Sequence, residues 1–384
     1  MAEDWQEGGF GLYVHWPFCA AKCPYCDFNS HVVSSVDHAR WRAAYLREIA
    51  RYAALVPDRV LGSIFFGGGT PSLMPPETVA AIIAAARAAW PMANDPEVTL
   101  EANPGSVEAG RLALYAEAGV TRVSLGVQAL EDRDLRRLGR LHSVAEAIDA
   151  LDIARKYFPR TSFDLIYARQ DQSLDAWQAE LGRALDLAAD HLSLYQLTIE
   201  SGTAFGARHA AGRLPGLPDE SLAADMFHAT QEMTAAAGFH AYEVSNHARP
   251  GAESRHNLIY WRAGDYVGIG PGAHGRLTFG GRRHATEAWP MPEAWLTQVE
   301  SGSGESLRAV LAPEEQPTEF LLMGLRLAEG IDMARFARLS GVPLNAATLA
   351  HLGEIGMVEV EGGRLRATPA GRAVLNAVIG ALLT

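Results

Sequence analysis

Three cysteines lie close together in the chain, at Cys19, Cys23 and Cys26, and the 384 residues contain no other cysteine. The CxxxCxxC spacing brings three thiolates within reach of one inorganic centre. Three ligands cannot complete a four-ligand site, so one metal position stays open. This donor set suits a [4Fe–4S] cluster in which one iron is free to bind a small molecule.

Two other uses of these cysteines fit less well. A disulfide framework is disfavoured because an odd, clustered set of three cannot pair off. A structural zinc ion would need a fourth ligand, with His15 and His31 as the nearest candidates, and the chain has no second cysteine pair to complete such a site. The cluster is therefore the favoured interpretation, with a zinc-bearing protein as the plain alternative.

The elements that must position these cysteines alternate between short β-like runs and amphipathic helical stretches. Helix starts are indicated by capping residues at Asp37, Ser143 (with Glu146) and Ser173, and by Pro76 early in a helix that runs to Trp90. Strands are predicted at Phe10–His15, Val60–Phe66, Val98–Ala102, Val123–Val127, Thr161–Ile166 and His191–Leu197.

Six β-then-α units in succession predict parallel strands joined by right-handed crossovers. Six units fall short of a closed eight-fold barrel, so the fold class is α/β, a partial (β/α)6 barrel. Ligands in such sheets bind at the carboxyl ends of the strands, and the cysteine segment follows the first strand. We therefore expect the chemistry at that end of the sheet.

Polar residues follow or end four of the other strands. Gly67-Gly68-Gly69-Thr70-Pro71 ends the second, and its glycines allow the backbone to approach a ligand closely. The other polar residues at these strands are Glu101, Gln128, Arg140 and Asp164. Each of them alone is as often a structural polar group as a ligand. Together they offer acceptors for hydroxyl and amine groups and an arginine for a carboxylate.

These motifs resemble the radical SAM superfamily, in which the open iron is chelated by the amine and carboxylate of S-adenosylmethionine (SAM). The resemblance is strongest to the branch that contains oxygen-independent coproporphyrinogen III oxidase and the related haem chaperones. The matching segments are Tyr13–His15, Gly67–Pro71, Glu101–Pro104, Leu138–His142, Phe163–Ile166, Tyr195–Thr198 and Glu319–Arg326. The SAM contacts that the resemblance implies are Tyr13, Tyr25, Gly68, Gly69, Thr70, Glu101, Gln128, Arg140 and Asp164.

Three features favour the chaperones within this branch. The oxidase carries a fourth cysteine two residues after the third, where this chain has Phe28. The oxidase also has a substantial amino-terminal extension, whereas 18 residues precede Cys19 here. Arg255–Trp261 matches the HNxxYW segment of the chaperones, which implies His256 as a haem ligand, with aromatic cover from Tyr260 and Trp261. Propionate partners would be Arg255 or Arg262.

One segment departs from the family pattern. Relatives place a Pro-Gly pair after the fifth strand, and Ala168–Gln172 lacks it. We expect a different turn there, which weakens any ligand contact inferred around Arg169.

The remaining sequence predicts a second, smaller domain. We divide the chain into a barrel at 1–235, an associated segment with the HNxxYW motif at 236–300 and a C-terminal domain at 305–384, with Ser301–Gly304 as a linker. Helices followed by a hairpin around Gly362-Gly363 indicate a winged-helix-like α+β domain. Residues 305–384 carry 7 Arg against 9 acidic residues, and the whole chain has a net charge of −12, so nucleic-acid binding is not expected.

The expected function is that of a radical-SAM-type haem chaperone with a [4Fe–4S] cluster and SAM. It would bind haem and deliver it to respiratory haem proteins at the cytoplasmic face of the membrane. No apolar run of membrane-spanning length and no signal-peptide stretch occurs, so we expect a cytoplasmic protein that meets the membrane through partners. The sequence leaves the oligomeric state open, with a homodimer as one candidate. The main alternative is the oxidative decarboxylation of coproporphyrinogen III, and a further one is radical chemistry on an unrelated substrate. No catalytic residue is assigned.

Overall fold

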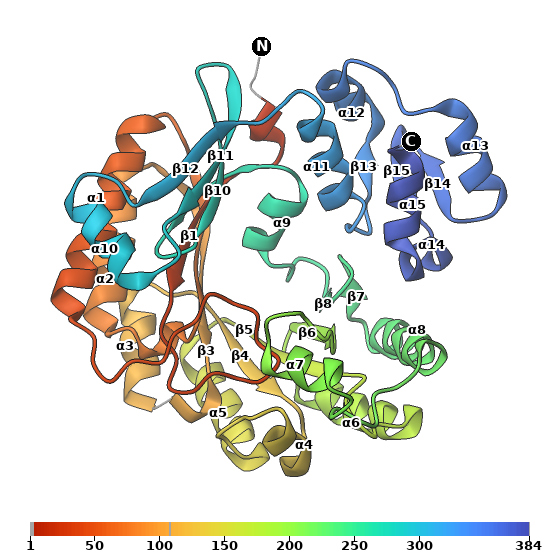
Figure 1. Ribbon diagram of the computed structural model, residues 1–384, viewed down its shortest axis with the longest axis horizontal. Coiled ribbons are helices and arrows are strands. Elements are labelled where there is room, and N and C mark those ends of the chain that lie inside the picture. Colours follow the sequence, from red (N-terminus) through yellow and green to blue (C-terminus); the bar gives the residue numbers. More distant parts are fainter. Residues whose placement is uncertain (1–3, 107–108, 384) are drawn as a thin grey trace.

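The computed structural model describes residues 4–106 and 109–383. Its centre is a parallel sheet in which six strands lie in sequence order, so that each pairs with the next along the chain (Figure 1). All six predicted strands are confirmed: β1 (Phe10–Trp16), β2 (Leu61–Gly68), β3 (Met92–Ala102), β4 (Arg122–Gln128), β5 (Arg160–Tyr167) and β6 (His191–Gln196).

Helices connect these strands and cover the outside of the sheet (Figure 1). The predicted caps are confirmed: Asp37 accepts from the amide of Arg40, and Ser143 and Glu146 form the capping box. Ser173 likewise caps its helix. The helices are α1 (His38–Leu55), α2 (Pro76–Ala89), α3 (Ala109–Ala118), α4 (Asp132–Arg137), α5 (Val144–Tyr157) and α6 (Leu174–Leu187), with short 3-10 turns at Asp4–Glu7, Pro71–Leu73 and Pro104–Ser106.

The sheet continues beyond the six parallel strands at both ends, giving twelve strands in the order β12-β11-β10-β9-β1-β2-β3-β4-β5-β6-β8-β7. Ser301–Gly304 joins α10 to β12, so the sheet extends past this segment. The added elements are α7 (Ala204–Ala210), α8 (Glu220–Ala236), β7 (His240–Ala241), β8 (Asn246–Ala248), α9 (Arg255–Trp261), β9 (Asp265–Ile269), β10 (His274–Phe279), β11 (Arg282–Ala288), α10 (Pro292–Glu300) and β12 (Glu305–Val310).

The C-terminal residues form a small α+β domain, as expected. Its three-stranded sheet has the order β13-β15-β14, and it has its own apolar core, which includes Phe320, Leu321 and Leu365. Its elements are α11 (Glu315–Gly324), β13 (Ile331–Asp332), α12 (Met333–Ser340), α13 (Ala346–Glu354), β14 (Val358–Glu361), β15 (Arg364–Ala367), α14 (Pro369–Ala373) and α15 (Leu375–Leu382).

The main core fixes the strand that carries the cysteine segment. Leu12 and Val14 are fully buried within β1, and Trp16 at its end packs edge-on against Trp41 of α1 with ring centroids 5.8 Å apart. Replacing Leu12 by alanine would leave a cavity that costs about 2–5 kcal/mol of stability. Within the part of the chain that the structure describes, no helix combines the length and the apolar character needed to cross a membrane.

Candidate functional site

The cysteine segment belongs to the long loop after β1, at the carboxyl end of the parallel strands (Figure 1). All three cysteines line one cavity. The loop is closed on itself by backbone hydrogen bonds: the Cys19 amide donates to the His31 carbonyl at 2.9 Å, and the Cys26 amide donates to Cys23 at 3.1 Å. Burial raises the pKa of the Cys19 and Cys26 thiols. Metal binding at this loop would therefore release protons.

The glycine-rich turn after β2 packs directly against the cysteine loop. The Gly69 amide donates to Trp16 at 2.7 Å, and the Thr70 hydroxyl lies 3.4 Å from the Cys19 sulfur. A Cβ on Gly68, which has φ of 109°, would lie 2.6 Å from the His15 ring, and one on Gly69 would lie 2.8 Å from a backbone oxygen. Only glycine permits this close approach of the two segments.

Two half-buried carboxyl groups, Glu101 and Asp164, face the same cavity from β3 and β5. Burial and the nearby Asp164 raise the pKa of Glu101 to about 8. Burial likewise raises the pKa of Asp164 to about 6, although Ser124 donates to it at 3.3 Å. A cationic ligand would restore the charged form of both groups.

Arg140 connects the cysteine loop to the ends of β3 and β4. Its guanidinium donates to the Cys23 sulfur at 3.3 Å, to the Gly126 carbonyl at 3.0 Å and to Asn103. Its Nε atom is buried and has no hydrogen-bond partner among the described residues. Gln128 beside it has φ of 73°, a left-handed conformation that is costly for a non-glycine residue and typical of functional sites.

The residues present fit the implied cofactors. Three thiols, a free arginine donor and two carboxyl groups suit a cluster together with an amino acid that carries an ammonium, a carboxylate and a sulfonium group. The cavity brings together eleven of the predicted site residues: Cys19, Cys23, Tyr25, Cys26, Gly68, Gly69, Thr70, Glu101, Gln128, Arg140 and Asp164.

Tyr13 lies outside this cavity. It lines a neighbouring cavity, and its hydroxyl is 2.9 Å from Nδ1 of His15. The two cavities share Gly68, Glu101 and Phe28. Tyr13 is therefore separated from the cysteines by this shared wall.

The histidines that we considered for zinc are held by another residue. Asn29 accepts a hydrogen bond from each: its backbone carbonyl is 2.9 Å from His15 Nε2, and its side-chain oxygen is 3.0 Å from His31 Nε2. Among residues 4–106 and 109–383, no three His, Cys, Asp or Glu side chains converge as ligands of a single metal ion.

His256 lies in α9 and is fully buried. Both ring nitrogens are hydrogen-bonded, Nδ1 to Ser63 at 2.7 Å and Nε2 to the Tyr260 hydroxyl at 2.6 Å. Burial and the charge of Arg122 lower its pKa to about 3, so the imidazole is neutral. Tyr260 lines the second cavity, and His256 lies behind it.

The arginines near these motifs have structural partners. Arg255 pairs with Asp95 at 2.7 Å, and Arg262 pairs with Glu329 at 2.9 Å. Arg169, in the turn that lacks Pro-Gly, is buried and pairs with Glu180 at 2.6 Å. Ala168 and Asp171 in that turn have φ of 58° and 59°, so left-handed residues make the turn.

Sequence reasoning missed several residues of the cavity wall, among them Asn103, Ser124 and Ser30. Asn103 carried a signal, because it lies within the Glu101–Pro104 motif at a strand end. Ser124 lies inside a strand, and only the register between β4 and β5 places it opposite Ser162, beside Asp164. No local pattern marks such a position.

Comparison with known proteins identifies the family. Residues 13–179 match the model of the Radical SAM superfamily, and residues 311–374 match the HemN C-terminal domain. The Escherichia coli protein named heme chaperone HemW is 41% identical over 86% of this chain and 86% of its own length. The mitochondrial radical S-adenosyl methionine domain-containing protein 1 of Bos taurus is 41% identical over 97% of this chain and 87% of its own.

The fold has a solved counterpart. Coproporphyrinogen III oxidase (HemN) from E. coli superposes with a TM-score of 0.82, covers 99% of this chain and 92% of its own, and shares 21% identity. That likeness concerns the fold, including the small C-terminal domain. With the relatives above, it places this chain in the radical SAM superfamily, in the HemN-like branch close to HemW.

Proposed function

We propose that this protein is a haem chaperone that holds a [4Fe–4S] cluster and SAM and passes haem to respiratory haem proteins. The observation that carries the proposal is the 41% identity, over 86% of the chain, to a protein named heme chaperone. Two further relatives of that name, from Haemophilus influenzae and Mycobacterium tuberculosis, are 37% and 36% identical.

The residues of the first cavity have distinct tasks in this proposal. Cys19, Cys23 and Cys26 hold the cluster, which supplies one-electron chemistry toward the sulfonium of SAM when both are bound. Glu101 and Asp164 accept from the amine and ribose groups of SAM and offset its positive charge. Arg140 positions the carboxylate of SAM. Its guanidinium already donates to the thiol of Cys23 on one side and to the Gly126 carbonyl of β4 on the other.

Phe28 supports a role other than porphyrin decarboxylation. It occupies the position of the oxidase's fourth cysteine, and its ring is 57% exposed where the two cavities meet. An apolar, exposed side chain at that point suits contact with a flat apolar cargo.

The axial ligand of haem has two candidates. The HNxxYW resemblance nominates His256, which would first have to exchange its bonds to Ser63 and Tyr260. The geometry favours a different histidine, which faces a neighbouring cavity. We also propose that the protein works in the cytoplasm, where it meets its recipients at the membrane face, alone or as a homodimer.

The test is an anaerobic pair of assays on the full chain with its cluster reconstituted. We expect saturable haem binding, seen as a Soret band that stops growing at a fixed ratio, and no decarboxylation of coproporphyrinogen III. Absence of specific haem binding, together with conversion of coproporphyrinogen III by the same preparation, would assign the protein to the oxidase reaction instead.

A further inference from the structure

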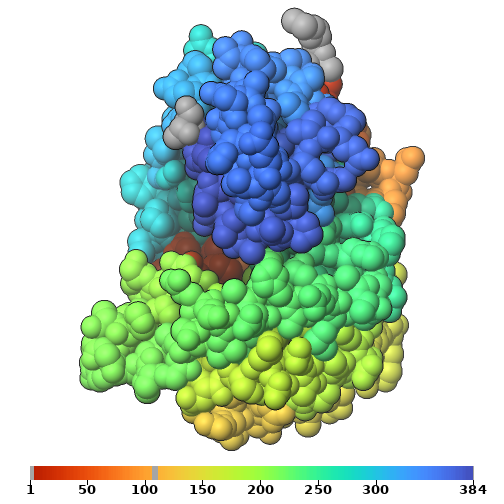
Figure 2. Space-filling model, turned by 90° about the vertical axis from the view of Figure 1, so that its right-hand side faces the viewer, coloured from red at the N-terminus to blue at the C-terminus, as the bar shows by residue number. Residues whose placement is uncertain are grey.

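A second cavity of about 380 Å³ opens beside the proposed SAM site. Its volume lies within the range of about 300–1,000 Å³ that is usual for sites of small molecules and cofactors. Figure 2 shows dark red N-terminal atoms at the floor of a hollow bordered by the blue C-terminal domain and by cyan and green segments. The cavity lining includes Tyr13 and Asn29 from the N-terminal part, His274 from β10 and Met323 from α11.

The walls of this cavity are rich in aromatic rings. Tyr13, Tyr260 and Tyr266 line it, and the last two pack edge-on with centroids 4.4 Å apart. Burial raises the pKa of all three phenols, so they remain neutral and do not offer phenolate ligands. Such walls suit a flat, largely apolar ligand.

Three histidines lie in or behind the wall, and they differ in what their rings contact. Both nitrogens of His15 are engaged, by Tyr13 and by the Asn29 carbonyl. Both nitrogens of His256 are engaged, by Ser63 and Tyr260.

His274 is different. Its side chain is 61% exposed at the start of β10, and Nδ1 lies 3.9 Å from Glu287. Its Nε2 has no hydrogen-bond partner among the described residues, which leaves this nitrogen available to a metal. The Glu287 carboxylate lies on the Nδ1 side of the ring, beyond hydrogen-bond distance.

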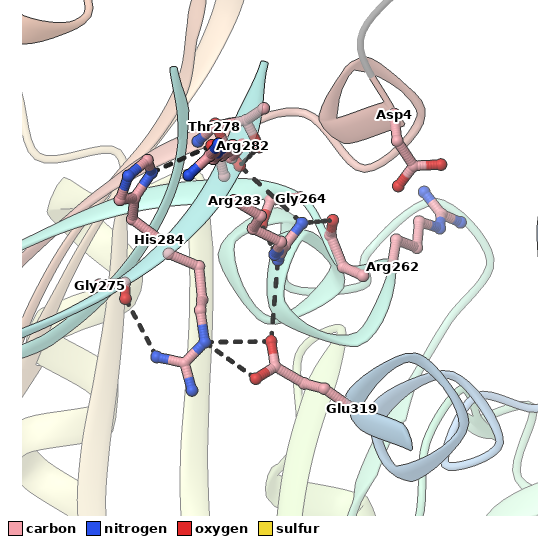
Figure 3. A network of polar contacts seen from close by, with 12 residues as sticks. Asp4, Arg262, Gly264, Gly275, Thr278, Arg282, Arg283, His284 and Glu319 are labelled. Atoms are coloured by element: carbon pink, nitrogen blue, oxygen red, sulfur yellow. Dashed lines mark hydrogen bonds and ion pairs between the residues drawn. The ribbon is translucent and has the colours of Figure 1, made fainter. Parts of the chain in front are cut away.

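The C-terminal domain completes the cavity from the other side. Glu319 of α11 accepts from Arg276 at 2.9 Å and lies 3.9 Å from Arg283, and Figure 3 shows its carboxylate facing these guanidinium groups of the β10–β11 hairpin. Met323 is one helical turn further along α11, on the same face, and lines the cavity. The ion pairs of Glu319 thus hold the thioether of Met323 over the same cavity that His274 faces.

We propose that this second cavity binds haem with Nε2 of His274 as an axial ligand, beside the SAM site. The inference rests on the proposed function, since it names the place where the haem cargo is held. His256 is then a positioning residue, which orients Tyr260 in the cavity wall through its 2.6 Å hydrogen bond. The shared residues Gly68, Glu101 and Phe28 put the macrocycle next to the cluster cavity.

The experiment is an anaerobic haem titration of the full, cluster-reconstituted chain, read by absorption and by EPR of the ferric haem. His274→Ala should lose the imidazole-ligated spectrum and bind haem about tenfold or more weakly. Added free imidazole should restore the spectrum. His256→Gln should keep the imidazole-ligated spectrum, with at most a change in affinity.

The matched control is His284→Ala, which removes a half-buried histidine from the same hairpin, where its ring stacks on Phe279. It should leave the titration unchanged. An unchanged spectrum in His274→Ala would overturn the inference, as would loss of the spectrum in His256→Gln alone.

A third cavity offers a competing location, between α8 and the C-terminal domain, with His228, His240, Arg366 and Arg372 in its lining. Loss of the spectrum in His228→Ala or His240→Ala, with His274→Ala unaffected, would place haem there and overturn the inference. Absence of haem binding by the wild type would instead overturn the proposed function itself.

Discussion

Each cysteine of the loop contributes a thiolate that no other residue of the chain can replace, because the sequence has only three cysteines. Substitution of Cys19, Cys23 or Cys26 by alanine should therefore abolish the cluster, since two thiolates do not hold it. The measurement is iron and acid-labile sulfide content after anaerobic reconstitution. Ser35→Ala, in the same loop and exposed, should load normally. Full iron and sulfide in any cysteine variant would contradict the site.

Glu101 and Asp164, the two carboxyl groups of the cluster cavity, should make the stability of the cofactor-free protein depend on pH. Glu101 has its pKa raised from 4.5 to about 8, so the folded state keeps a proton that the unfolded chain releases. The free energy of unfolding should therefore fall as the pH rises from about 4.5 to about 8. Asp164 adds a change of the same sign between about 3.8 and about 6.

Glu101→Gln tests this directly, because glutamine does not titrate. Urea unfolding at several pH values should give a smaller decline in stability for the variant than for the wild type. An identical pH dependence in the two proteins would show that Glu101 does not titrate as its burial requires.

At the residue scale, much of the site could be predicted from the sequence. The motifs after successive strands converge because parallel strands share one carboxyl end, and eleven of the predicted residues line a single cavity. Tyr13 and His256 could not be placed in this way. Tyr13 faces the second cavity, and His256 lies behind the wall of that cavity. Both positions depend on how β9 and α9 pack against β1.

At the scale of elements, local capping signals were reliable because they depend on a few neighbouring residues. Ser143→Ala removes the cap of α5 and should lower the free energy of unfolding by about 0.5–2 kcal/mol. Urea denaturation measures the change. Ser35→Ala is the control and should unfold like the wild type, whereas equal stability of Ser143→Ala would mean that the cap contributes nothing.

Elements formed by long-range pairing were harder to predict. β9 lies beside β1 in parallel although more than 200 residues separate them in the chain, and β12 continues the same sheet beyond the glycine–serine segment. A run of six residues carries no information on its distant partner. The six sequential strands could be predicted because each pairs with the next one along the chain.

At the scale of the whole molecule, the C-terminal domain is attached to the hairpin by the Glu319 ion pairs. Glu319→Gln should loosen this contact, at a cost of up to about 3 kcal/mol for charged hydrogen bonds. Hydrogen exchange should become faster in α11 (Glu315–Gly324), while cluster content stays normal. Glu361→Gln, on the exposed hairpin of the same domain, should leave exchange in α11 unchanged, and unchanged exchange in Glu319→Gln would contradict the anchoring role.

In the proposed function, haem handling needs the cluster cavity, the second aromatic cavity and the C-terminal domain that covers it. The most direct test is transfer of haem from the loaded, cluster-containing protein to membranes that carry a haem-free respiratory enzyme. We predict that the enzyme regains activity faster than with the same concentration of free haem, and that Cys23→Ala abolishes the advantage. Haem that stays on the protein, or transfer no better than from free haem, would contradict the proposed chaperone function.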